Sequence, residues 1–191
     1  MAKSLAHSFT PIAGRDAEIL ILGSMPGRAS LEAGQYYAHP RNAFWSIMAE
    51  LLRFQPASDY RAKIRALRAA RIALWDVLES CERTGSMDSG IDPDTITAND
   101  FRSFFRRHRG IGRVFFNGAV AESCYRQHVL PSVDAGAASY ARLPSTSPAN
   151  TVPYAQKLRA WRAALRLRPA PPGASRSARS THSETLPVRI R

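Results

Sequence analysis

The sequence has few cysteines and no long apolar run. Its two cysteines, Cys81 and Cys124, are too few for a four-thiolate iron–sulfur or cysteine-rich zinc site and form no C-x-x-C pair. We expect both thiols to be reduced and partly buried. No apolar stretch approaches the ~18 to 20 residues that span a bilayer, and residues 1–11 lack the apolar core of a signal peptide. We therefore expect a cytoplasmic protein without a membrane partner, associated with the nucleoid if the cell is bacterial.

Acidic residues are also scarce. The chain has 15 Asp and Glu against 27 Lys and Arg, so its formal net charge is +12. A charge of this size predicts a polyanionic partner such as nucleic acid. Lys3, Lys63 and Lys157 are the only lysines, so 24 of the 27 cations are arginine. Two explanations of this bias stay open, namely phosphate binding and a GC-rich coding sequence.

The length favours one folded domain. A chain of 191 residues that is 45% hydrophobic can bury a full core without a disulfide or a metal. We expect this domain over residues 1–167. Residues 168–191 are rich in Pro, Ser and Arg and have no periodic apolar face, which predicts a disordered basic tail.

Short apolar runs alternate with amphipathic segments along the predicted domain. The runs predict strands at 18–22, 72–75, 113–116 and 139–143. The segments between them predict helices at 43–53, 59–70, 98–107, 118–129 and 153–167. This alternation indicates an α/β protein with a mainly parallel sheet covered on both faces. Ligands of such sheets bind beyond the carboxyl ends of the strands, so the loops that follow the strands are the candidate site.

The loop after the first predicted strand reads Gly23-Ser24-Met25-Pro26-Gly27. It lacks the Gly-Lys-Ser/Thr ending of a phosphate-binding P-loop and the three-glycine spacing of a dinucleotide fingerprint. Taken alone, the loop is also compatible with a structural turn. We therefore expect no cofactor and no metal.

Two further segments of the sequence help to interpret this loop. Residues 35–45 place aromatic side chains beside His39, Arg41 and Asn42, and residues 143–150 are rich in Pro and Ser. Together the three segments resemble the uracil-DNA glycosylase superfamily, most closely its hypoxanthine-DNA (deoxyinosine) glycosylase branch. In that branch a Gly-Ser-Met-Pro-Gly loop also precedes Tyr-Tyr-Ala-His-Pro-Arg-Asn. The resemblance covers about residues 19–161 and implies a three-layer α/β/α sandwich with a central four-stranded parallel sheet.

The resemblance also implies a base pocket and a DNA-facing segment. The first loop, with Gly23, Ser24, Met25 and Pro26, would form the floor of the pocket. The Pro-Ser segment would press on the DNA backbone and help to extrude the target nucleotide, which costs a few kcal/mol. The residues expected to contact the DNA backbone are Arg41, Ser145, Thr146 and Ser147.

Met25 departs from most of the superfamily, which carries Asp or Asn at this position to activate or position the attacking water. A thioether cannot usefully accept a proton. In the hypoxanthine branch the role falls to the Asn of His-Pro-Arg-Asn, which is Asn42 here. We expect Asn42 to orient water and to stabilise charge near the sugar. An Asn just before a helix is also a favoured N-cap, and the two roles are compatible.

Four other residues are assigned to the pocket, each with a plainer alternative. Tyr37 would stack on the extruded base, or it packs under its loop. His39 would donate to a phosphate or the base, or it is structural. Asp76 would accept from N1–H of hypoxanthine, or it caps a helix or pairs with an arginine. Asn117 would contact the base, or it only begins a turn and a helix.

Arg102, Arg106 and Arg109 share one face of a predicted helix. Two interpretations stay open for them, a contact with DNA phosphates and an ordinary solvated helix face.

These observations favour a monomeric, monofunctional DNA glycosylase of base-excision repair that hydrolyses the N-glycosidic bond of deoxyinosine and leaves an abasic site. A Schiff-base lyase would need an amine in the pocket, yet the three lysines lie outside the strand-end loops in the sequence. Three alternatives remain: a uracil or mismatch-specific uracil glycosylase, a catalytically inactive DNA-binding member of the fold, and a small-molecule α/β enzyme.

Overall fold

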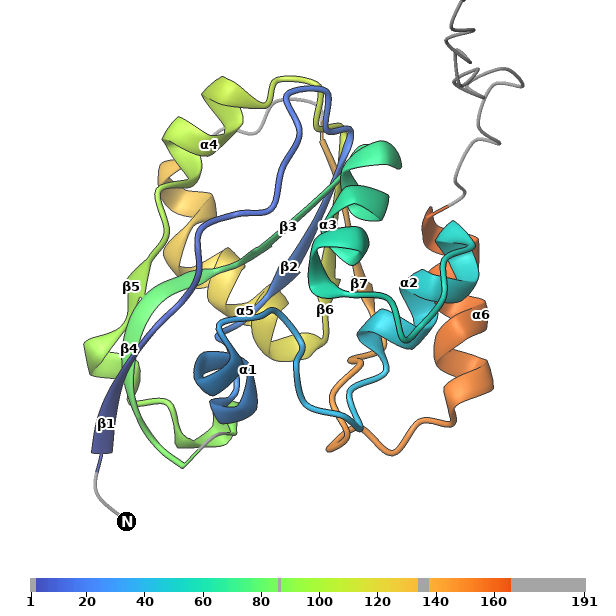
Figure 1. Ribbon diagram of the computed structural model, residues 1–191. Coiled ribbons are helices and arrows are strands. Elements are labelled where there is room, and N and C mark those ends of the chain that lie inside the picture. Colours follow the sequence, from blue (N-terminus) through green and yellow to red (C-terminus); the bar gives the residue numbers. More distant parts are fainter. Residues whose placement is uncertain (1–2, 86, 134–137, 166–191) are drawn as a thin grey trace, which may run out of the picture.

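The centre of the molecule is a four-stranded parallel sheet (Figure 1). The computed structural model describes residues 3–85, 87–133 and 138–165. The strand order is β3 (Ile72–Asp76), β2 (Ile19–Gly23), β6 (Arg113–Asn117) and β7 (Ser139–Leu143). All four strands were predicted to within one residue of these bounds, so the parallel sheet is confirmed. Residues 166–191, which include the predicted tail, lie outside the described ranges.

Burial explains why these runs form the sheet. Every residue of β2 and β3 is buried, as expected for apolar strands covered on both faces. β3 is an edge strand, but Ile12 covers its outer edge through two backbone hydrogen bonds with Leu74, of 2.9 and 2.8 Å. β7, at the other edge, is mostly exposed. The strands with the most continuous apolar sequence, β2 and β3, are therefore the most completely buried.

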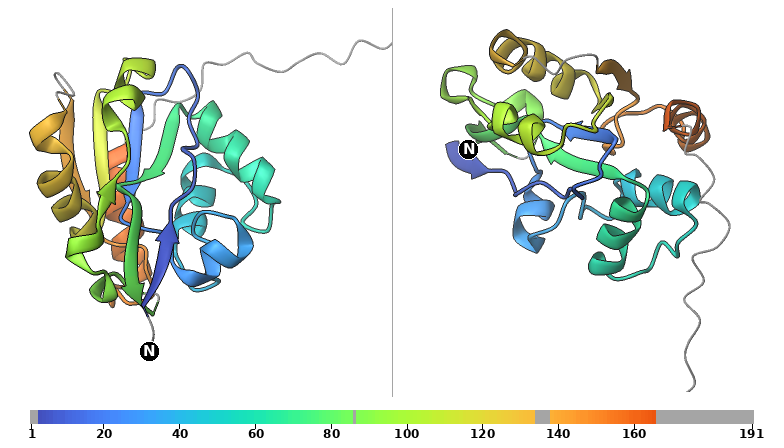
Figure 2. Two further views of the ribbon diagram at one scale, coloured as in Figure 1. Left: turned by 90° about the vertical axis from the view of Figure 1, so that its left-hand side faces the viewer. Right: turned by 90° about the horizontal axis from the view of Figure 1, so that it is seen from above.

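Helices cover both faces of the sheet and make three layers (Figure 2). On one face lie α1 (Arg28–Ala33), α2 (Phe44–Leu52) and α3 (Tyr60–Ala69), and on the other lies α5 (Ala119–His128). α4 (Phe101–Arg107) leads into β6, and α6 (Tyr154–Leu165) contacts β7 and α2. The three-layer prediction is confirmed, although the short helix α1 was not predicted.

One predicted helix begins later than expected. We expected a helix from residue 98, but α4 begins at Phe101. Thr97 and Ala98 pair instead with a neighbouring strand, and the carboxylate of Asp100 accepts a hydrogen bond from Ser103 N at 3.0 Å. The strand pairing and the aspartate cap together set the start of this helix.

A small antiparallel sheet that was not predicted extends the fold. Its order is β1 (Lys3–His7), β4 (Leu78–Thr84) and β5 (Thr97–Ala98). The chain passes from β3 into β4 through Val77. Asn99 holds this crossing, because its side-chain amide donates to the carbonyls of Asp76 at 2.9 Å and Leu78 at 3.0 Å. The end of β3 is thereby fixed where the site begins.

The core supports the loops as well as the sheet. The Trp161 ring on α6 is fully buried and packs edge-on against Phe44 of α2, with ring centroids 5.9 Å apart. Its indole N–H donates to the carbonyl of Pro144 at 3.0 Å. Cys81 and Cys124 are free and both buried. Within the described ranges, no helix has the length and apolar content needed to cross a membrane.

Candidate active site

The loops that follow the four parallel strands meet at the carboxyl edge of the sheet. Gly23 and Asp76 are register partners at the ends of β2 and β3. The backbone pairing continues past these ends, because Val77 N donates to Gly23 O at 2.9 Å and Leu78 N to Ser24 O at 3.1 Å. The first loop is therefore held against the segment that follows β3. Met25 and Pro26 in this loop are buried, as a pocket floor requires.

Gly23, Tyr37 and Asp76 come together at the centre of this edge. A Cβ atom on Gly23 would lie 2.3 Å from Asp76 Oδ1 and 3.0 Å from Tyr37 Oη. Asp76 Oδ2 and Tyr37 Oη are buried and form no well-aligned hydrogen bond within the described residues. The Asn117 side chain lies close enough to Tyr37 to oppose the rise in the tyrosine pKa that burial causes. Leaving one buried polar group unpaired costs about 1–3 kcal/mol, so two such groups on the side chains that crowd one glycine are a feature to be explained. A bound molecule with complementary polar edges would satisfy both.

Asp76 lies in surroundings that favour its neutral form. Burial is the main cause that raises the pKa of Asp76 to about 8, and the nearby Asp88 carboxyl adds to the rise while Arg83 opposes it. Asp88 is held by Ser24, whose hydroxyl donates to it at 2.8 Å. Asp76 forms no ion pair with another described residue. These causes favour the carboxylic acid form of Asp76 near neutral pH, and its contact with a base stays a prediction.

Tyr37 is held in an unusual conformation. Its φ of 54° lies in the left-handed region, which is strained for a bulky side chain. The ring stacks on Phe44 with centroids 4.2 Å apart, so one of its faces is already covered within the protein. Neighbouring bonds hold the segment, since Trp45 Nε1 donates to the carbonyl of Tyr36 at 2.8 Å. Packing under the loop is thus observed, and stacking on a base stays a prediction for the other ring face.

The Asn42 side-chain amide forms a hydrogen bond within the protein through its oxygen only. Its Oδ1 accepts a hydrogen bond from Phe44 N, the first residue of α2, at 3.0 Å. This contact resembles the capping alternative but is shifted by one residue, because Ala43 occupies the N-cap position. The Asn42 Nδ2 group has no partner among the described residues, and the side chain is half-buried. The amide N–H groups are therefore free to bind a ligand or water.

His39 and Arg41 lie on the same segment. His39 Nδ1 accepts a hydrogen bond from Arg41 N at 3.1 Å, which leaves Nε2 as the nitrogen that carries a proton. Arg41 is exposed and forms no ion pair within the described part of the chain. Both side chains are thus free to donate outward, and their contact with a phosphate remains a prediction.

Asn117 and Thr146 bind each other instead of facing the solvent. Asn117 Nδ2 donates to Thr146 Oγ1 at 2.9 Å, and Thr146 N donates to Asn117 Oδ1 at 2.8 Å. Thr146 is fully buried. Its position differs from that of the predicted DNA contact, because its hydroxyl is engaged in the interior. The amide of Asn117 is likewise engaged in joining the end of β6 to the late loop.

Ser145 and Ser147 flank Thr146 and are half-buried. The Ser145 hydroxyl accepts from Ser147 N at 3.2 Å. Ser145 also lies against Gly118, where a Cβ atom would be 2.9 Å from Ser145 Cβ and where φ is +103°. Only glycine fits this close approach without strain. The late loop is therefore built around Thr146, with its serines nearer the surface.

Lys157 contacts this loop from α6. Its buried ammonium donates to the carbonyl of Asn150 at 2.8 Å and to that of Ser147 at 3.4 Å. Desolvation lowers the pKa of this amine. In the sequence Lys157 lies outside the strand-end loops, but in three dimensions its ammonium reaches the last of them. Its ammonium binds the loop's backbone carbonyls.

The sequence did not point to Arg83 and Asp88. Arg83 is 2% exposed, and Asp88 is held by Ser24 beneath the first loop. Both follow β3 in the small antiparallel sheet and the turn after it, neither of which was predicted. An isolated Arg or Asp in a polar segment carries no spacing signal, so these residues could be found only through the fold.

Comparison with known proteins gives consistent results. The family described as Uracil DNA glycosylase superfamily matches residues 11–167. A hypoxanthine DNA glycosylase of Methanosarcina barkeri is 36% identical over 113 residues, which are 59% of this chain and 70% of the relative. A hypoxanthine DNA glycosylase of Methanosarcina acetivorans is 33% identical over 138 residues, which are 67% of this chain and 85% of the relative. An NMR structure from Methanosarcina acetivorans, described as a candidate uracil DNA glycosylase, superposes with a TM-score of 0.71 at 30% identity and covers 85% of this chain and 98% of its own.

Replacing Gly23 by Ala tests the close approach at the pocket floor. The added methyl group would collide with Asp76 and Tyr37, so we expect the free energy of unfolding to fall by about 1–3 kcal/mol. Gly112→Ala is the matched control, because no atom lies within 4 Å of its Cβ position and its φ is not positive. Urea unfolding of the two variants measures the difference. Equal stabilities would mean that the floor has room that the structure does not show.

The pKa of Asp76 predicts a specific dependence of stability on pH. The unfolded carboxyl titrates near 3.8, whereas the folded one keeps its proton to about 8. The free energy of unfolding of the wild type should therefore fall, relative to Asp76→Asn, as the pH rises from about 4 to about 8, by at most about 1.4 kcal/mol per pH unit. Asp88 is present in both proteins, so its titration largely cancels. Urea unfolding across this range measures the effect, and parallel curves would show that Asp76 titrates normally.

Proposed function

This chain belongs to the uracil DNA glycosylase superfamily, and we propose that it removes hypoxanthine from deoxyinosine in DNA as a monofunctional glycosylase of base-excision repair. The relatives named hypoxanthine DNA glycosylase support the activity at the level of a DNA glycosylase. The net charge of +12 suits a DNA substrate. The reaction needs water, and its products are the free base and an abasic site.

The observation that carries the proposal is that the two side chains that crowd Gly23, Asp76 and Tyr37, each hold a buried polar atom without a hydrogen-bond partner among the described residues, Oδ2 and Oη respectively. A neutral carboxylic acid offers one donor and one acceptor in one plane. Hypoxanthine presents an N1–H donor beside its O6 acceptor, so the acid can bind this edge with two hydrogen bonds. Met25, where most of the superfamily has Asp or Asn, further favours the branch that the relatives' names indicate.

Asn42 is the proposed catalytic residue. Its Nδ2 group is free, and its Oδ1 is fixed by Phe44 N, so the amide is oriented before the substrate binds. In the reaction the bond between C1′ and the base nitrogen breaks, and its electron pair leaves with the base. The oxygen of a water held by Asn42 bonds to C1′, and a proton from that water ends on the base. An amide is a weak base, so we assign the free Nδ2 group of Asn42 the orientation of water. Any stabilisation of positive charge at the sugar would fall to its Oδ1, which also accepts from Phe44 N.

The residues expected to contact DNA divide into two groups. Arg41 and His39 donate outward from the segment before α2, and Ser145 and Ser147 lie near the surface of the late loop. Thr146 supports that loop from inside through Asn117. We propose that Arg41, His39 and the two serines position the DNA backbone. Thr146 holds the late loop, and with it the serines, at a fixed distance from the segment of Arg41 and His39.

Uracil is the second candidate base. It presents a similar N–H donor and carbonyl acceptor, so the Asp76 edge alone does not distinguish it from hypoxanthine. The structural neighbour described as a candidate uracil DNA glycosylase favours keeping this alternative. The size of the bound base, one ring or two, is the property that separates the two substrates.

A direct assay tests the substrate. Duplex oligonucleotides that differ only in one deoxyinosine, deoxyuridine or normal base are incubated with the purified protein and then treated with alkali to cleave abasic sites. We expect cleavage at deoxyinosine well above that at deoxyuridine. Cleavage without alkali would indicate a lyase and contradict the monofunctional assignment. Preference for deoxyuridine would assign the chain to the uracil readers.

The role of Asn42 is tested by Asn42→Ala. Excision should fall by at least about 100-fold, while the affinity for a deoxyinosine duplex stays within a few-fold and the free energy of unfolding falls by only about 1 kcal/mol. Asp59→Ala is the matched control, because Asp59 caps another helix, α3, where its Oδ1 accepts a hydrogen bond from Ala62 N. Loss of a cap alone would lower stability in both variants and leave excision intact in both. That outcome would remove Asn42 from the catalytic role.

A further inference from the structure

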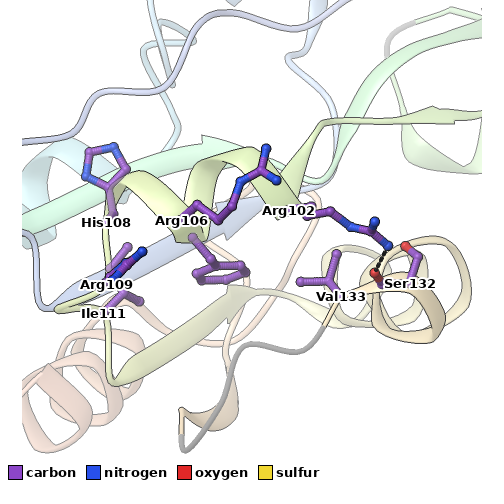
Figure 3. Close-up of a pocket in the computed structure, with 8 residues that line it drawn as sticks. Arg102, Arg106, His108, Arg109, Ile111, Ser132 and Val133 are labelled. Atoms are coloured by element: carbon purple, nitrogen blue, oxygen red, sulfur yellow. Dashed lines mark hydrogen bonds between the residues drawn. The ribbon is translucent and has the colours of Figure 1, made fainter.

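A groove of about 500 Å³ lies between α4 and the segment before residue 134 (Figure 3). Arg102, Arg106 and Arg109 line it together with Ile111, Ser132 and Val133. Figure 3 shows Arg102 reaching across to Ser132, where its guanidinium donates to the backbone carbonyl at 3.0 Å. The groove therefore has walls from two elements that are distant in the sequence.

This groove lies at the opposite end of the sheet from the candidate active site. Ile111 lies two residues before the start of β6, whose last residue, Asn117, belongs to the site. Five residues of a strand span about 16 Å. In Figure 1, α4 lies at the far end of the molecule from α1 and from the loop that precedes α6. A nucleotide bound at the carboxyl edge of the sheet does not reach the groove.

The arginines of the groove carry charge that the described part of the protein does not neutralise. All three are exposed, and none forms an ion pair with another described residue. Asp100, at the start of the same helix, uses its carboxylate to accept from Ser103 N. Arg106 donates to the Ser103 hydroxyl at 2.7 Å, which holds its side chain along the helix. Arg102 and Arg106 each use one N–H group in a hydrogen bond within the described part of the chain, so the groove presents their remaining N–H groups and the guanidinium of Arg109 to an incoming anion.

The base of the groove is apolar. Ile111 is 6% exposed, and Phe105 and Val133 are half-buried beside it. Carboxylates on a ligand would match the arginines, which bind this group with two parallel hydrogen bonds. An apolar side chain on the same ligand would be covered by the three hydrophobic residues. Charge and apolar surface together select a ligand that has both.

We propose that this groove binds an acidic segment of another protein, with one apolar side chain of that segment seated against Phe105, Ile111 and Val133. The chain cannot supply the occupant from its own tail, because residues 168–191 contain five Arg and one Glu. A second copy is equally disfavoured by the net charge of +12. A DNA backbone would satisfy the arginines but has no apolar group to seat in the base of the groove. A peptide of acidic residues with one hydrophobic residue meets both requirements.

The experiment measures binding of a short fluorescein-labelled peptide of Asp and Glu residues that ends in Phe. The control peptide ends in Ser and is otherwise identical. Fluorescence anisotropy with the full chain should show at least about tenfold weaker binding of the Ser peptide. Because the change is made in the ligand, this comparison does not depend on how a protein variant folds. It also does not depend on which base the protein excises.

Variants of the groove complete the test. Arg106→Glu with Arg109→Glu should weaken binding of the Phe peptide by at least about tenfold. The matched control is Arg65→Glu with Arg68→Glu, which changes two exposed arginines of α3 that form no ion pair with described residues. Circular dichroism establishes that each variant is folded. The control should bind the peptide within about twofold of the wild type.

Three results would overturn the proposal. Equal binding of the Phe and Ser peptides would show that only net charge attracts them. Unchanged binding by the Arg106 and Arg109 variant would place the peptide elsewhere. Failure of both peptides to bind, with a loss of affinity for an undamaged DNA duplex in that variant alone, would make the groove a nucleic-acid contact.

Discussion

The mutual hydrogen bonds between Asn117 and Thr146 are the constraint on which the candidate active site depends. The side-chain amide of Asn117 both donates to and accepts from Thr146, so the end of β6 and the late loop are joined at one point. The carbonyl of Thr146 then accepts from Ala43 N at 3.0 Å. Ala43 directly follows Asn42. Through one buried residue, the strand end, the late loop and the proposed catalytic segment are therefore fixed relative to one another.

The same constraint explains why two residues expected to face the ligand are engaged in the interior. A buried hydroxyl or amide must find a partner, and in Thr146 and Asn117 each satisfies the other. Lys157 and Trp161 add to this support from α6, since they donate to the carbonyls of Asn150 and Pro144. Buried polar contacts therefore support the loop that we propose to contact DNA. They fix its backbone, and with it the positions of Ser145 and Ser147 near the surface.

At the floor of the site, in contrast, buried polar atoms are not paired with each other. There the polar atoms of Asp76 and Tyr37 are buried without partners, and Tyr37 keeps a left-handed backbone. Three other buried polar atoms of the described residues, Arg83 Nη1, His108 Nδ1 and Tyr125 Oη, also lack a partner, but these do not share a glycine with a second such group. An unsatisfied polar pair next to a glycine that has no room for a methyl group is the expected form of a site completed by its ligand. Tyr37 combines both features, a left-handed backbone and a buried hydroxyl without a well-aligned partner, at the place where the proposed chemistry occurs.

The sequence by itself determined the parallel sheet and most helices, because the hydrophobic period of strands such as 19–23 and 72–76 is a local property that burial enforces. It also located the loops of Gly23 and Asn42, whose order along the chain carries the family resemblance. The antiparallel sheet, the burial that raises the pKa of Asp76 and the interior position of Thr146 were decided only by the tertiary structure. Each of these depends on contacts between segments far apart in the chain, such as β1 with β4 or Asn117 with Thr146. Desolvation and hydrogen-bond partners arise only when those segments meet, so no local pattern encodes them.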